Sequence, residues 1–166
     1  MNDTYVEVMV ARKKPPMLGA LKTILYVLAV FCFLSSLYMN VLLLAAAAGF
    51  AAVAFFVLPR LDIEYEYLYL DKEITIDKIM SREKRKNVFT ADLNKMEFMA
   101  RENSHELDSY RSRNLKTYDF TSGEALSPVY TIVYSGGGET ELINIEPNEE
   151  MLHAIKMVFP RKVIDI

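Results

Sequence analysis

The chain has 166 residues, of which 52% are hydrophobic and 25% are charged, and its formal net charge is −3. Residues 60–166 carry 15 Lys and Arg against 20 Asp and Glu, so this part is acidic and lacks the basic surface by which proteins bind nucleic acid. Cys32 is the single cysteine, which excludes a disulfide framework and favours a reducing compartment.

The first segment, residues 1–16, is predicted to be a cytoplasmic tail that ends at Pro15-Pro16. Two apolar stretches follow within residues 17–59, and after Lys22 neither contains a charged residue. They run over Thr23–Met39, extended backwards to Met17, and over Val41–Leu58. Each is close to the roughly 20 residues that a bilayer core requires, so a transmembrane hairpin of two helices is predicted.

The charges beside the apolar stretches predict the orientation. Arg12, Lys13 and Lys14 precede the first stretch and Arg60 follows the second. Short loops rich in Lys and Arg stay on the cytoplasmic side, so we expect a multi-pass protein of the cell membrane with two spans and both termini in the cytoplasm. A cleaved signal peptide is the alternative, but the second apolar stretch follows too closely for a mature polar N-terminus.

Small residues recur at four-residue spacing in the second stretch, where Ala45 pairs with Gly49 and Ala48 with Ala52. Such a face allows another helix to approach closely. The partner is either the first helix of the same hairpin or a second copy of the chain in a homo-oligomer. Because neither stretch contains Asp, Glu, His or Arg, the hairpin is typical of an anchor and not of a transport pathway.

From residue 60 onward the pattern changes to short alternating segments bounded by turn residues, which predicts strands and one soluble domain over residues 60–166. Tyr65, Tyr67 and Tyr69 share the face expected to enter the core, and Glu64 and Glu66 lie on the opposite, solvated face. Six to seven strands are expected, near residues 63–69, 74–80, 84–91, 95–100, 115–120, 129–134 and 139–145. An amphipathic helix, capped by Asn148 and stopped by Pro160, is expected over residues 148–159.

A strand meander followed by one C-terminal helix resembles the pleckstrin-homology (PH) superfold. The stretch YEYLYLDKEITIDKIMSREKRKNVFTADLNKMEFMA, residues 65–100, is similar to the opening of bacterial PH-like domains that follow a transmembrane hairpin in small uncharacterised membrane proteins. This resemblance implies an α+β protein in which the hairpin precedes a PH-like antiparallel barrel or sandwich, capped by the C-terminal helix. It implies a fold more than an activity.

Positive charge concentrates in the turn between the second and third of these strands. Phosphoinositide-binding PH domains use basic residues around their first strand connection, but here that connection is the near-neutral Asp71-Lys72, so no specific phosphoinositide site is expected. A solvated turn that protects a strand edge is the alternative to a contact with the membrane or a partner. A second candidate contact is the polar loop Arg101–Asn114. The basic candidates are Arg82, Lys84, Arg85 and Lys86.

No catalytic constellation, metal site or cofactor motif is visible, so an enzyme is not expected. His105 lies in a polar loop without the further ligands that a metal needs, and His153 lies away from the apolar face of the last helix. The sequence therefore predicts a membrane-anchored PH-like binding or scaffolding module. The alternative is a small accessory subunit assembled through the second helix. The expected partners are the lipid bilayer and a membrane protein or a second copy of the chain.

Overall fold

A computed structural model describes residues 5–14, 17–38, 40–58, 62–80 and 84–164. The chain divides into two units, and each is described by itself. The first comprises Met1–Lys13, Glu64–Ile79 and Arg85–Ile166, and the second comprises Lys14–Ile63 and Met80–Lys84.

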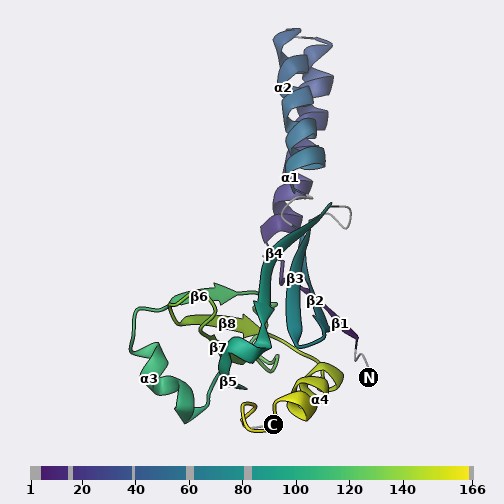
Figure 1. The fold of residues 1–166 in the computed structure, drawn as a ribbon. Helices are drawn as coiled ribbons and strands as arrows, with labels where there is room; N and C mark the ends of the chain where they lie inside the picture. Colours follow the sequence, from purple (N-terminus) through teal and green to yellow (C-terminus); the bar gives the residue numbers. More distant parts are fainter. Residues whose placement is uncertain (1–4, 15–16, 39, 59–61, 81–83, 165–166) are drawn as a thin grey trace. The chain divides into compact units, whose positions relative to one another are not determined.

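Four strands form the first sheet in the spatial order β1-β2-β3-β4 (Figure 1). The core face of β2 carries the three predicted tyrosines, which are at most 5% exposed, so this prediction is confirmed. Asp71 and Lys72 both have positive φ, as a two-residue hairpin turn between β2 and β3 requires. The strands are β1 (Val6–Ala11), β2 (Ile63–Leu70), β3 (Glu73–Met80) and β4 (Lys84–Asp92).

Strand β1 comes from the segment that the sequence predicts to be a tail. It pairs with β2 in antiparallel register, with Val6 opposite Tyr69 and Ala11 opposite Glu64. Val6 and Val10 are buried, because alternate residues of a strand point to the same face of the sheet. The first sheet therefore begins before the apolar hairpin, and the hairpin is an insertion between two neighbouring strands.

The second sheet has the spatial order β5-β7-β8-β6. Strand β6 pairs with β8 in parallel, whereas the sequence predicts an antiparallel meander throughout. The described strands form two sheets instead of a closed barrel, and a short 3₁₀ turn, η3 (Leu93–Lys95), connects β4 to β5. The strands are β5 (Met96–Arg101), β6 (Lys116–Asp119), β7 (Tyr130–Tyr134) and β8 (Glu141–Ile145).

The segment between β5 and β6, predicted to be a loop without regular structure, is folded. It contains the 3₁₀ turn η4 (His105–Leu107) and the short helix α3 (Asp108–Arg111). Leu107 is the apolar anchor of this segment and is 1% exposed. A single buried leucine gives no helical period, which is why the pattern of the sequence did not predict the fold of this segment.

The predicted C-terminal helix is present as α4 (Glu149–Val158). The Asn148 side chain accepts a hydrogen bond from the Met151 N–H at 2.8 Å, as expected of an N-cap. Met151, Leu152 and Ile155 are buried on one face of the helix. After the helix the chain returns to β5, where Met99 forms a parallel bridge with Val163.

The second unit contains two helices that pack side by side, α1 (Met17–Ser36) and α2 (Leu42–Ala52) (Figure 1). A π-helical turn, η1 (Val53–Val57), continues α2. By length and composition α1 can cross a bilayer, whereas Leu42–Val57 is a shorter apolar helix. Close packing of the pair centres on alanines, because Ala29 of α1 and Ala47 and Ala54 of the second arm are its buried residues.

Candidate functional site

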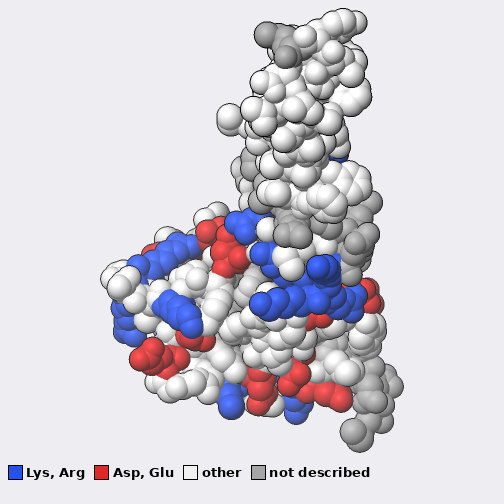
Figure 2. All heavy atoms as spheres, turned by 90° about the horizontal axis from the view of Figure 1, so that it is seen from above, with Lys and Arg blue, Asp and Glu red and all other residues white. Residues whose placement is uncertain are grey.

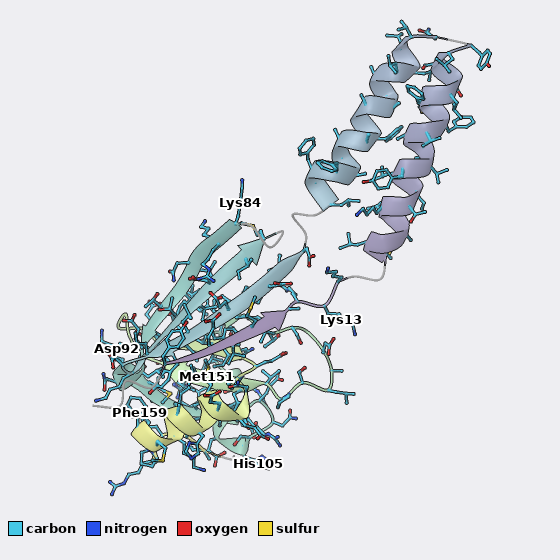
Figure 3. All side chains as sticks on the ribbon, turned by 90° about the vertical axis from the view of Figure 1, so that its right-hand side faces the viewer. Lys13, Lys84, Asp92, His105, Met151 and Phe159 are labelled. Atoms are coloured by element: carbon cyan, nitrogen blue, oxygen red, sulfur yellow. The ribbon has the colours of Figure 1, made fainter. Side chains whose placement is uncertain are left out.

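The predicted basic contact lies at one end of the first sheet. Neighbouring strands joined by two or three residues must be antiparallel, because a parallel connection needs a dozen residues or more. Strands β1 and β2 are antiparallel by their register, with Ala11 opposite Glu64. The end of β1, the start of β2, the end of β3 and the start of β4 therefore lie at the same end. Figure 3 shows Lys13 and Lys84 at this end of the sheet and Asp92 at the other.

We call Arg12, Lys13, Arg85 and Lys86 the basic end of the first sheet, and all four are exposed. Figure 2 shows one larger patch of Lys and Arg side chains on the face in view, with smaller groups apart from it. The backbone N–H of Lys13 donates to the Ser122 carbonyl at 2.7 Å, and an Arg12 guanidinium N–H donates to the Tyr65 hydroxyl at 3.2 Å. These contacts hold the end of β1 in place.

The four predicted basic residues differ in their surroundings. Arg82 lies outside the described residues. Lys84 begins β4 and Lys86 follows two residues later, both exposed and both without an ion pair among the described residues. Arg85 is different, because its Nη2 donates to Glu66 Oε1 at 2.6 Å. Arg85 thus has a structural partner, while Lys84 and Lys86 are the two described members available for another surface.

The sequence predicts a solvated Glu66, and this prediction is wrong. Glu66 is buried, with 1% of its surface exposed. Its Oε2 has no hydrogen-bond partner in the described part of the chain. Burial raises the pKa of Glu66, Arg85 opposes the shift, and the neighbouring Glu7 and Asp77 carboxylates raise the pKa further. Arg85 is therefore the cation that compensates a desolvated carboxylate across β2, β3 and β4.

The four predicted helix-packing residues, Ala45, Ala48, Gly49 and Ala52, are all exposed in the hairpin. The α1 contact uses Ala47 and Ala54, which lie roughly opposite Ala45 and Gly49 on a helix with 3.6 residues per turn. Ala45, Gly49 and Ala52 are therefore not among the buried residues of the described hairpin. A Cβ added at Gly49 would meet nothing within 4 Å, so the hairpin itself does not require glycine there.

The hairpin also carries an apolar groove of about 400 Å³ between its helices. Tyr26, Ala29 and Phe33 line it from α1, and Ala47, Ala48 and Ala51 line it from α2. Of the predicted small residues, Ala48 alone contributes to this groove. Its lining is almost wholly apolar, which suits hydrocarbon and not a polar ligand.

The histidines take the positions expected for solvated side chains. His105 is exposed, with its Nδ1 3.4 Å from Asp108 Oδ2, and His153 is exposed on α4. Within the described ranges, no group of three or more His, Cys, Asp and Glu side chains could hold a metal ion. The sequence did not predict one further cluster of polar residues at the second sheet, because its members come from four separate segments. They are Glu102, Arg111, Arg113, Thr117, Thr131 and Asn144.

The two sheets, the helix α4 and the apolar hairpin between β1 and β2 together define a PH-like domain with an inserted hairpin. The chain belongs to the family described as Bacterial PH-like domain (DUF6106), whose model matches residues 2–165. The match includes β1 and the hairpin segment as well as both sheets. No curated protein and no solved structure matches the chain. The PH-like part of the predicted resemblance is confirmed.

Proposed function

We propose that the protein is a two-span membrane anchor built into a PH-like domain, which it holds at the cytoplasmic face to bind a partner. The observation that carries this proposal is the pairing of Ala11 with Glu64. The chain leaves β1 and returns to β2 at the same end of one sheet. If any part of the insert crosses a membrane, it must cross an even number of times.

A second observation supports the conclusion that the inserted segment begins and ends at the same place. Lys14 and Asp62, at the two ends of the inserted segment, form an ion pair with an Nζ to Oδ2 distance of 2.7 Å. The two ends of the hairpin thus lie together at its base. A single crossing by α1 alone would separate these ends by the thickness of the bilayer, roughly 30 Å.

The surface of the hairpin also supports insertion into lipid. Phe31 in α1 is 66% exposed, and Leu42 and Phe55 in the second arm are 72% and 66% exposed. Leaving each such side chain in water costs about 1.5–3 kcal/mol relative to burial. The second arm is shorter than α1, and a bilayer accommodates a short span by local thinning at a modest cost.

The basic residues favour the cytoplasmic side for the domain. Arg12, Lys13 and Lys14 adjoin the start of the hairpin, and positive charge is retained on that side. An anionic leaflet would attract Lys84 and Lys86 by about 1 kcal/mol each if they approach within a Debye length. Anchoring then raises the effective concentration of the domain for a membrane partner, so that weak contacts suffice.

Replacing the hairpin tests the proposal. Because Ala11 lies opposite Glu64, an Asn-Gly turn in place of residues 13–62 should connect β1 and β2 directly. The expected product is a folded domain that leaves the membrane fraction, detected by fractionation and by cooperative unfolding. A folded domain that remains on membranes without the hairpin would contradict the anchoring role, and an unfolded product would contradict the insertion.

A second candidate function is that of a small subunit assembled through the second helix. The observation that favours it is the exposed face containing Ala45, Gly49 and Ala52, turned away from α1. Gly49→Leu should abolish co-purification of a membrane partner or a second copy, while Ala46→Leu, exposed on the flank of the same helix, should not. Equal co-purification of both variants would exclude this function.

A further inference from the structure

The outer face of the second sheet is covered by the segment between β5 and β6. Leu107 of this segment packs with Ala100, Val133 and Leu142, which project from β5, β7 and β8. Phe98 and Tyr110 extend the contact, with ring centroids 5.5 Å apart in an edge-to-face arrangement. The segment thus forms an additional layer, held by an apolar contact and independent of the hairpin.

A cavity of about 200 Å³ lies beside this apolar contact, and Leu107 and Leu142 form the apolar part of its lining. That volume is far above the roughly 10–15 Å³ that one water molecule needs and below the 300–1,000 Å³ of sites for drug-sized ligands. A small molecule or a single functional group therefore fits. Its polar lining consists of Glu102, Arg111, Arg113, Thr117, Thr131 and Asn144.

The floor of the cavity belongs to the rigid sheet. Thr131 of β7 lies opposite Asn144 of β8, and Thr131 Oγ1 donates to Asn144 Oδ1 at 2.9 Å. Thr131 is 4% exposed. With Oδ1 engaged, Asn144 keeps its amide N–H groups for another acceptor. Thr117 of β6 lies opposite Leu142 and extends the floor.

The rim is supplied by two arginines of the covering segment. Arg111 Nη1 is 3.7 Å from Asp108 Oδ1, and the Arg113 guanidinium lies 5.5 Å from the centroid of the Tyr110 ring. These contacts orient the two guanidinium groups, and most of their N–H donors have no partner among the described residues. Arg111 and Arg113 make the lining rich in donors, and Glu102 is the carboxylate of the lining. Two further carboxylates lie near these cations, because Asp108 lies beside Arg111 and Arg113 lowers the pKa of Glu97.

We propose that this cavity is a binding site for a phosphate group, held by Arg111, Arg113 and Asn144, with Glu102 accepting from an ammonium or hydroxyl group of the same ligand. Three donors that approach from the rim and the floor match the three terminal oxygens of a phosphate monoester better than the planar pair of a carboxylate. A soluble metabolite and a lipid headgroup can both supply this chemistry. The site goes beyond the anchoring role and does not depend on it.

Inorganic phosphate is the first probe. We expect the NMR signals of the Asn144 side chain and of the segment 102–113 to shift saturably when phosphate is added to the full chain in micelles at constant ionic strength. The double variant Arg111→Gln and Arg113→Gln should weaken binding at least tenfold. Arg101→Gln, exposed near the same segment but outside the lining, is the matched control and should bind as the parent chain does.

A second arm of the experiment identifies the source of the phosphate. Micelles doped with phosphatidic acid should shift the same signals if a lipid headgroup is the ligand, whereas a response to inorganic phosphate alone assigns a soluble one. The proposal is overturned if neither probe gives a saturable shift, if the double variant binds unchanged, or if Arg101→Gln loses binding equally. Unchanged signals from β7 and α4 in each variant show that the fold is intact.

Discussion

Ala11 lies directly opposite Glu64 in the first sheet, although the whole apolar hairpin separates the two residues in the sequence. The segment before the hairpin is therefore part of the PH-like domain and not a tail. The segment inserted between these paired strands is attached to the domain through two connections.

Strand β1 should contribute to the stability of the domain. Val6 is 3% exposed against the edge of β2, and Val6→Ala removes two methyl groups, so we expect a loss of about 1–2 kcal/mol in the free energy of unfolding. Met9→Ala, at a position 57% exposed on the same strand, is the control and should cost less than 0.5 kcal/mol. Hydrogen exchange of the β2 amides measures the stability of both variants. Equal protection in the two variants would refute a packed β1.

Arg85 should stabilise the domain because it compensates the charge of the buried Glu66 carboxylate. Arg85→Gln leaves a buried carboxylate without its cation, and about 1–3 kcal/mol of stability should be lost, less than for a fully buried pair because Arg85 is half-exposed. Lys86→Gln removes the same charge from the next residue and should leave the stability nearly unchanged. Urea denaturation of the full chain in mild detergent distinguishes the two, and similar midpoints would contradict the pairing.

The pKa of Glu66 predicts a pH dependence. Burial raises this pKa above its ordinary value of 4.5, so the folded state binds a proton more tightly than the unfolded state does. The Glu66 contribution to stability therefore falls as the pH rises from about 4.5 through the raised pKa. Glu66→Gln cannot ionise, so its stability relative to the parent chain should increase over this range and then level off. A difference independent of pH would refute the raised pKa.

The packing of residues 101–114 against the second sheet should depend on Leu107. Leu107→Ala should cost about 2–4 kcal/mol, because the side chain is fully buried against the outer face of the second sheet. Leu126→Ala, at a position 98% exposed, is the control and should have no effect. Protease sensitivity of residues 101–114 provides the measurement, and an unchanged cleavage rate in Leu107→Ala would show that the segment is not held by this contact.

The parts of the fold that sequence patterns could predict are those with local periodicity. The apolar arms of the hairpin, the tyrosine face of β2 and the capped helix α4 each repeat within one short segment. Strand β1 was missed because its partner lies beyond the hairpin, although the alternation of Val6, Val8 and Val10 was a usable signal. A strand of six residues gives little evidence until its neighbour is known.

The candidate sites were less predictable, because they depend on register between strands. Nothing in the local sequence shows that Arg85 reaches Glu66 across the sheet, so the basic turn gave no sign that one of its charges is engaged. The phosphate cavity combines Arg111 and Arg113 with Thr131 and Asn144, which come close together only after β7 and β8 pair. Charge and spacing identified the region of positive charge but not the separate roles of its residues.

Accessibility of single cysteines in intact cells tests the two-span anchor most directly. In a Cys32→Ser background, Tyr38→Cys reports the connection between the helices and Asn103→Cys reports an exposed position in the domain. The two-span anchor predicts that a membrane-impermeant maleimide labels Tyr38→Cys at once and labels Asn103→Cys only after permeabilisation. Labelling of both positions, or of Asn103→Cys alone, in intact cells would contradict it.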